Sequence, residues 1–101
     1  MTHKTFVQLQ AENRRCALLR FLADDPDYSL NTSILQTVLE AIGHGVSRDQ
    51  IDTDAAWLEE QGLVDREDLG GIVVVKLTRR GLDVAAGRTV APGVKRPGPG
   101  M

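Results

Sequence analysis

The strongest constraint on the fold is a change of hydrophobic period at Gly62. Before Gly62, apolar residues recur at helical spacing behind a capping box, in which Ser47 is followed three residues later by Gln50. After Gly62, a polar stretch containing Gly70 and Gly71 leads to a β-branched run, IVVVKL, which is typical of a β-hairpin. This part of the chain therefore predicts a helix that leads directly into a hairpin. The inner stripe of the helix consists of Ile51, Ala55 and Leu58.

The rest of the chain supplies three more predicted helices. Residues 6–23 carry apolar side chains at helical spacing. A second helix is capped by Ser29 or Asn31. A last helix is capped by Thr78 and contains Gly81, which is mildly unfavourable inside a helix. The order helix, helix, helix, hairpin, helix predicts a mainly α protein with a β-hairpin wing, which is the winged helix-turn-helix fold.

Length and composition predict one folded domain, residues 1–88. A chain of 101 residues has little to spare for a second core. Residues 89–101 hold three of the four prolines and the basic pair Lys95 and Arg96. We therefore expect a flexible basic tail, rich in proline and glycine, after the domain.

The sequence also predicts a cytoplasmic protein that does not enter a membrane. No apolar run approaches the ~20 residues needed to span a bilayer, and the N-terminus lacks the core of a signal peptide. Cys16 is the one cysteine, so no internal disulfide can form, and a reducing compartment is expected.

Charge is strongly segregated along the chain. The net charge is −2, but residues 1–23 sum to +3, residues 24–69 to −10 and residues 70–101 to +5. The acidic middle argues against a nucleic-acid partner, whereas the two basic ends can form one positive patch. Composition alone therefore does not decide whether the protein binds nucleic acid.

The motifs resemble a known class of proteins. The stretch VSRDQIDTDAAWLEEQGLV, followed by a hairpin and LTRRGLDVAAG, looks like the winged-helix regulators of the ArsR and MarR type over roughly residues 10–87. Through AWLEEQGLV and PGVKRPGP, nearly the whole chain resembles small winged-helix proteins of Mu-like phages and prophages. The resemblance implies a DNA-binding transcriptional regulator. The cysteine-bearing metal-sensing motif of many ArsR proteins is absent, so metal sensing is not implied.

On a DNA-binding interpretation, the helix before Gly62 reads the duplex. Gln50 and Thr53 can address base edges, and Arg48 can contact a phosphate or a guanine. The stretch 47–64, however, carries one basic residue against five acids, so the same face can instead be an ordinary solvated surface. The other candidates for DNA contact are the basic residues Arg66 in the wing, Arg79 and Arg80 in the last helix, and Lys95 and Arg96 in the tail.

Three apolar residues are candidates for a dimer or partner contact. Phe6 and Leu9 precede the central part of the first helix, where extensions often build a two-fold dimer, so we expect a homodimer. Trp57 lies off the inner stripe of its helix, where it either packs against the wing or the second helix or anchors a partner. The tail either contacts the phosphates or the minor groove of DNA, binds an acidic protein, or only keeps the chain soluble.

The sequence does not favour an enzyme, a metal site or a cofactor. Cys16 lies on an apolar helical stripe, and neither His3 nor His44 has a neighbour at metal-ligand spacing. No glycine-rich phosphate loop precedes a helix. Two functions remain: a DNA-binding transcriptional regulator of phage or prophage origin, or a winged-helix module that binds another protein through its acidic middle and basic tail and does not touch DNA.

Overall fold

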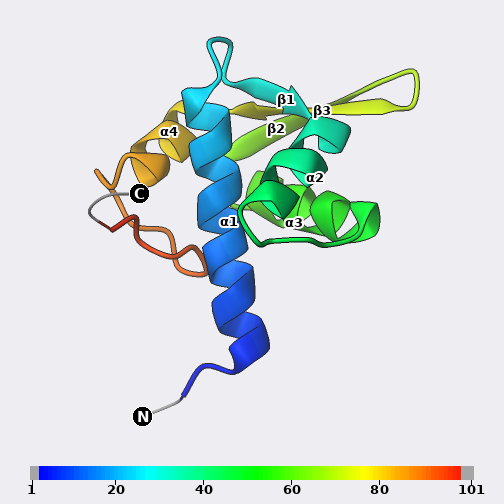
Figure 1. The fold of residues 1–101 in the computed structure, drawn as a ribbon. Coiled ribbons are helices and arrows are strands. Elements are labelled where there is room, and N and C mark those ends of the chain that lie inside the picture. Colours follow the sequence, from blue (N-terminus) through cyan, green and yellow to red (C-terminus); the bar gives the residue numbers. More distant parts are fainter. Residues whose placement is uncertain (1–2, 99–101) are drawn as a thin grey trace.

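The computed structural model describes residues 3–98, which form four helices and a three-stranded antiparallel sheet (Figure 1). No helix in this range is long and apolar enough to cross a membrane. Along the chain the elements are α1 (Phe6–Asp24), β1 (Ser29–Asn31), α2 (Thr32–Ala41), α3 (Arg48–Glu60), β2 (Val64–Leu69), β3 (Ile72–Leu77) and α4 (Arg79–Ala85).

The predicted hairpin is confirmed, and it is longer and tighter than the sequence indicates. Strands β2 and β3 pair from Val64 opposite Leu77 to Leu69 opposite Ile72. The polar residues that the sequence assigned to a turn therefore lie in β2. Only Gly70 and Gly71 form the loop, with φ of 66° and 93°. Both values lie in the left-handed region that a two-residue hairpin loop requires and that glycine adopts without strain.

The short strand β1 was not predicted. Its residues pair with β3, Asn31 lying opposite Val74, and this contact gives the sheet order β1–β3–β2. Asn31 also caps α2, because its side-chain oxygen accepts a hydrogen bond from the backbone N–H of Ile34 at 2.8 Å. The sequence indicated this cap but not the strand, since the partner of β1 lies more than 40 residues further along the chain. The resulting α+β arrangement is consistent with a winged helix.

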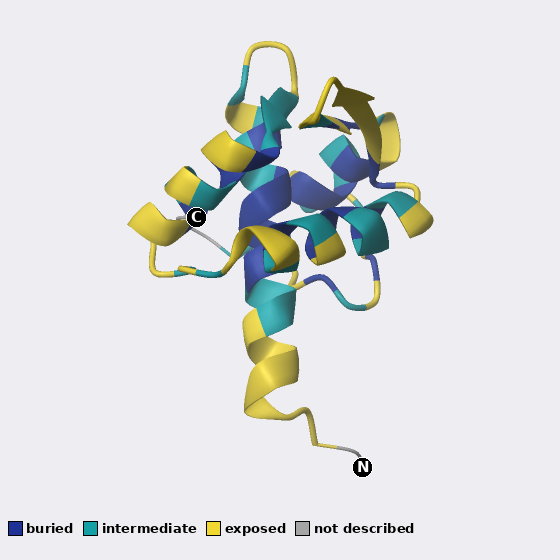
Figure 2. Ribbon diagram, turned by 90° about the vertical axis from the view of Figure 1, so that its right-hand side faces the viewer, coloured by how far each residue is buried: buried dark blue, intermediate teal, exposed yellow. Residues whose placement is uncertain are grey.

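Helix α1 is the centre of the core (Figure 2). It packs against α4, α2 and β3, and its N-terminal turns project from the globule. This projection contributes to the elongated shape, which measures 46 × 27 × 26 Å. The largest fully buried apolar side chains are Leu18, Leu19, Leu22, Leu35, Leu39, Ile51, Leu58, Leu63, Val64 and Val75.

The C-terminal segment differs from the expected flexible tail. Residues 88–98, which we call the C-terminal strap, fold back along α1 (Figure 1). Ala91 and Val94 are buried in the core, and the backbone N–H of Lys95 donates a hydrogen bond to the carbonyl of Glu12 at 3.1 Å. The two apolar side chains bind the strap to the globule despite its proline and glycine content. Residues 99–101 lie outside the described range.

Candidate nucleic-acid interface

Arg48, the basic residue predicted to contact phosphate or guanine, is the first residue of α3 and is exposed. Its Nε donates a hydrogen bond to Oε1 of Gln36 on α2 at 3.0 Å. This contact ties the start of α3 to α2 and holds the guanidinium at the surface between the two helices. A cation in this position is available to a ligand that approaches both helix starts.

Gln50 and Thr53, which were predicted to read base edges, are both bonded within α3. The amide of Gln50 donates to Oδ1 of Asp54 at 3.1 Å, so the predicted capping box is only half formed. The other half is present, because Ser47 Oγ accepts from the Gln50 backbone N–H at 3.1 Å. The Thr53 hydroxyl donates to the carbonyl of Asp49 at 2.9 Å. Thr53 is exposed and Gln50 is half-buried.

Asp54 is not part of the acidic surface that the sequence indicates. Its carboxylate is buried and forms a bidentate ion pair with Arg14 of α1, in which Nη2 lies 3.1 Å from Oδ1 and Nε contacts Oδ2. One acid of α3 and one base of α1 are therefore removed from the surface together. A signal for this burial was present in the sequence, since Asp54 lies three residues after Ile51 and four before Leu58, on the inner stripe.

Arg66 of the wing is also paired inside the molecule. Its backbone N–H donates to Oε2 of Glu59 at 2.8 Å, and its Nε and Nη2 reach Oε1 at 3.2 and 3.1 Å. The backbone hydrogen bond, followed by those of the guanidinium, lowers the pKa of Glu59. The wing arginine is thus held against the end of α3 and neutralises another of its acids.

A shallow hollow lies where α2, α3 and the hairpin loop meet. We call this the helix–hairpin surface, and its lining residues come from the start of α2, the start of α3 and the hairpin loop: Asn31, Thr32, Ser33, Arg48, Gly71 and Ile72. Arg48 is the only charged side chain in this lining. Figure 1 shows α2, α3 and the hairpin on the same side of α1.

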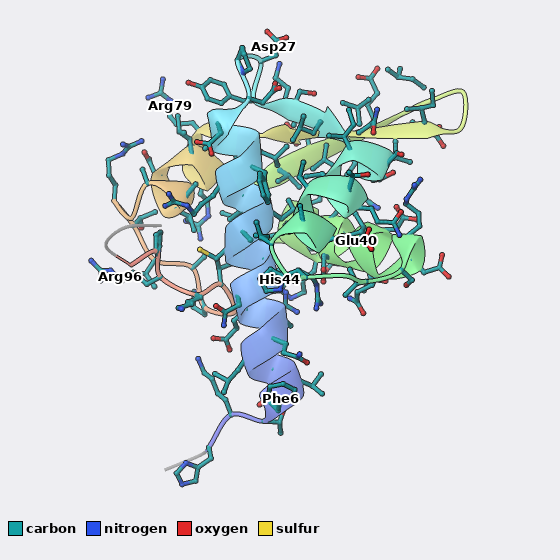
Figure 3. The ribbon with its side chains drawn as sticks, viewed as in Figure 1. Phe6, Asp27, Glu40, His44, Arg79 and Arg96 are labelled. Atoms are coloured by element: carbon teal, nitrogen blue, oxygen red, sulfur yellow. The ribbon has the colours of Figure 1, made fainter. Side chains whose placement is uncertain are left out.

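The remaining predicted DNA contacts lie elsewhere. Arg79 and Arg80 begin α4, and Lys95 and Arg96 belong to the strap. In Figure 3, Arg79 and Arg96 lie on the other side of α1 from α3. The Nε of Arg80 donates to the carbonyl of Gln61 at 3.3 Å. Arg79 and Arg96 therefore do not share a surface with α3, whereas Arg80 contacts the residue that caps the end of α3.

Trp57 is half-buried and packs against the core. The guanidinium carbon of Arg15 lies 4.1 Å from the centroid of the indole ring, which places a cation over its face. Arg15 Nη1 also donates to the carbonyl of Gly93 in the strap at 2.9 Å. Trp57 thus contacts α1 and the strap. The sequence gave no sign of this arrangement, because the Arg15–Gly93 hydrogen bond that accompanies it joins positions 78 residues apart.

The other two predicted partner residues are exposed at the free end of α1. Phe6 is 73% exposed and Leu9 is 46% exposed. Within residues 3–98, no group of three or more histidine, cysteine or acidic side chains is placed to hold a metal ion. Burial raises the pKa of the Cys16 thiol, and burial followed by the charge of Arg14 lowers the pKa of His44.

Fold and surface together define a small α+β protein with a helix-and-hairpin surface, and the comparisons with known proteins show its relatives. No family model matches the chain. It is 52% identical over 88 residues to the "Uncharacterized protein gp26" of Escherichia phage Mu, covering 87% of this chain and 91% of that protein. It is 39% identical over 79 residues to an "Uncharacterized protein" of Haemophilus influenzae, covering 77% and 76%. The chain belongs to the family of the phage Mu protein gp26.

Proposed function

We propose that this chain is a winged helix-turn-helix protein that binds duplex DNA through the helix–hairpin surface and acts as a transcriptional regulator of a Mu-like phage or prophage. The observation that carries the proposal is the convergence of the α2 start, Arg48 and the hairpin loop on one hollow. In winged helices the second helix of the motif enters the major groove by its N-terminal residues, while the first helix crosses the backbone. In this proposal α3 takes the role of the second helix and α2 that of the first.

Because of the internal ion pairs, α3 presents less negative charge to a ligand than the sum of its charged residues indicates. Asp54 is neutralised by Arg14 and Glu59 by Arg66. Asp49 remains exposed beside Arg48 and repels phosphate. The surface therefore offers few cationic contacts.

The logarithm of the binding constant for DNA falls with the logarithm of the salt concentration, with a slope of about −0.9 for each phosphate that the protein neutralises. Because this surface neutralises few phosphates, the salt dependence of binding should be shallow. Specificity must then come from neutral groups at the start of α3. The exposed hydroxyl of Thr53 is one of them.

The test compares two exposed arginines on opposite sides of α1. Arg48 lies on the helix–hairpin surface and Arg79 lies at the start of α4. Fluorescence anisotropy with a labelled duplex at low salt should show binding by the wild type, a loss of at least about fivefold for Arg48→Ala, and no change for Arg79→Ala, since one bidentate contact to a base contributes about 1–3 kcal/mol. Loss of binding only in Arg79→Ala would move the DNA to the α4 side and refute the proposed surface. Absence of binding by the wild type would refute the function.

A second candidate function is a winged-helix module that binds a protein, and the hairpin favours it. Leu69 and Ile72 flank the hairpin loop, face each other across the strands, and are 54% and 57% exposed. Beside them on the same face of the sheet are the acids Asp65 and Glu67. An apolar tip with an acidic flank is suited to a basic protein surface more than to phosphate.

The two functions are separated by changing the hairpin tip. Under the second candidate, Leu69→Ser, which lies outside the lining of the helix–hairpin surface, abolishes capture of one defined phage or host protein, while Arg48→Ala leaves that capture unchanged. Under the proposed function, Arg48→Ala abolishes duplex binding. A wild-type chain that captures no defined protein, together with a hairpin variant that binds DNA with wild-type affinity, would remove the second candidate.

A further inference from the structure

The N-terminal end of α1 is apolar and has no packing partner within the described part of the chain. Phe6 and Val7 are 73% and 72% exposed, and Figure 2 shows the first turns of α1 as an exposed projection from the globule. Figure 3 places Phe6 at the free end of this helix, away from α2, α3 and α4. The Thr5 capping box holds this end helical, so the aromatic ring is carried on ordered backbone.

The same helix has a hollow near its other end. Four of its lining residues, Ala17, Arg20, Phe21 and Asp24, come from α1, and Ile42 from the end of α2 completes it. The small side chain of Ala17 and the ring of Phe21 make much of this hollow apolar. It lies between the C-terminal half of α1 and the end of α2.

The ring and the hollow lie on one face of α1. A spacing that alternates between four and three residues marks one side of a helix and is the spacing of a helix–helix seam. Residues at this spacing, which we call the seam of α1, are Phe6, Gln10, Asn13, Ala17, Arg20 and Asp24. The large side chain is at the N-terminal end of the seam, the hollow is at the C-terminal end, and Asn13 is near the middle.

A surface with a projection at one end and a hollow at the other is complementary to itself when turned by 180°. In a two-fold interface each residue of one copy meets the matching residue of the other, so one patch must supply both partners. With the axis near Asn13, Phe6 of one copy reaches the hollow beside Phe21 of the second. These two positions are 15 residues apart, roughly 22 Å along the helix at 1.5 Å per residue.

Charge favours the same antiparallel arrangement. The last turn of α1 contains no basic residue and ends at the exposed acid Asp24, next to the negative end of the helix dipole. Lys4 lies just before the N-terminus of α1 and is exposed, although it also pairs with Glu12 at 2.8 Å. Antiparallel packing brings Lys4 of one copy to Asp24 of the other, and it places the positive end of each helix dipole beside a negative end.

We propose that the occupant of the hollow is Phe6 of a second copy of this chain, so that two α1 helices pack antiparallel along their seams. This inference does not depend on DNA binding. A single helix pair buries less than the ~1,600 Å² of a standard interface, so the dimer should form in the micromolar range of concentration. Sedimentation of the full chain, whose mass is 11.0 kDa, should show twice that mass as the concentration rises.

Substitution at Phe6 tests the projection. Phe6→Glu should shift the chain to monomer at concentrations where the wild type is dimeric. Val7→Glu adds the same charge to an equally exposed position, turned by about 100° from Phe6, and should leave the dimer in place. Circular dichroism checks that both variants fold, which is expected because both side chains are exposed. A wild type that is monomeric throughout, or a Phe6→Glu variant that stays dimeric, would overturn the proposal.

Cysteine cross-linking tests the direction of the two helices. Asn13→Cys lies near the axis and should form a disulfide with its own copy under mild oxidation. Phe6→Cys should not, because antiparallel packing separates the two copies of that position by roughly 20 Å along the helices. The wild type is the control, since its one cysteine, Cys16, is buried. Cross-linking of Phe6→Cys but not of Asn13→Cys would indicate parallel helices and refute the antiparallel arrangement.

Discussion

The guanidinium of Arg14 on α1 forms a two-point ion pair with the carboxylate of Asp54 on α3, and both residues are buried. Gln50 adds a third hydrogen bond to this carboxylate at 3.1 Å. The pair fixes the helix of the helix–hairpin surface against the central helix of the core. It also removes one positive and one negative charge from the two surfaces to which the sequence assigned them.

Breaking the Arg14–Asp54 pair from one side should strongly destabilise the fold. Asp54→Ala leaves the Arg14 guanidinium buried without a counter-charge, and such changes cost about 3–5 kcal/mol. Urea unfolding followed by circular dichroism should show this loss. The control is Asp52→Ala on the same helix, which is less buried and for which no ion pair is found within residues 3–98; it should change stability by less than about 0.5 kcal/mol. Equal effects of the two substitutions would contradict a structural role for the pair.

The parts of the fold that could be predicted from the sequence are those set by neighbouring residues. The Ser47 cap, the inner stripe of α3 and the glycine pair of the hairpin are local signals, and the structure contains all three. Strand β1 depends on pairing with β3, and the strap depends on contacts with α1 and Trp57. Local pattern does not encode such long-range contacts, and proline and glycine in residues 89–98 suggested disorder instead.

For the candidate surface, too, local position could be predicted from the sequence and long-range contacts could not. Position along the helix placed Arg48 and Thr53 on exposed parts of α3. Summed charge could not show which acids face the solvent, because Arg14 and Arg66 reach their partners across the fold. It also could not show that Arg79 and Arg96 lie on the far side of α1 (Figure 3).

The contact between the strap and Trp57 should be sensitive to one methyl group. A Cβ at Gly93 would lie 2.7 Å from two ring atoms of Trp57, and its φ of 92° also disfavours a side chain. Gly93→Ala should therefore displace the strap and cost about 1–3 kcal/mol beyond the backbone strain. Trp57 is the one tryptophan, so its fluorescence should shift to longer wavelength as the ring becomes wetter.

The matched control for Gly93→Ala is Gly43→Ala. Gly43 has a φ of 91°, and a Cβ there meets nothing within 4 Å, so it carries the same backbone strain without the clash. The difference between the two unfolding free energies isolates the contact of the strap with the ring. If the two variants are equally stable and their fluorescence spectra agree, the strap does not pack on Trp57 in solution.

The Glu59–Arg66 pair should contribute a small acid-side pH dependence. The pKa of Glu59 is lower in the folded chain than in the unfolded chain, mainly through the backbone hydrogen bond from Arg66. The contribution of the Glu59–Arg66 pair to folding stability is therefore present above the unfolded glutamate pKa of about 4.3 and is lost as the pH falls below that value. The pair is partly exposed, so solvent limits the effect to about 0.2–1 kcal/mol. Melting temperatures from pH 7 to 3 should fall less for Glu59→Gln than for the wild type, whereas Glu60→Gln at the exposed neighbouring position should follow the wild-type curve.

Gly81 in α4 should not tolerate a side chain, although alanine is the better helix former. A Cβ at this position would lie 2.0 Å from the carbonyl oxygen of Leu63 and 2.7 Å from Cδ1 of Leu77. The first of these atoms belongs to the backbone and cannot turn away, so α4 would have to move off the sheet. Helix propensity alone predicts that Gly81→Ala stabilises α4 by about 1 kcal/mol. Because of the close approach, we expect Gly81→Ala to destabilise the fold instead, by about 3 kcal/mol, which is at the upper end of the range for overpacked sites. Arg79→Ala, an exposed alanine substitution two residues earlier, is the control without the clash and should leave the free energy of unfolding within about 0.5 kcal/mol of the wild type. A Gly81→Ala variant as stable as the wild type would show that α4 packs against β2 and β3 less closely than this.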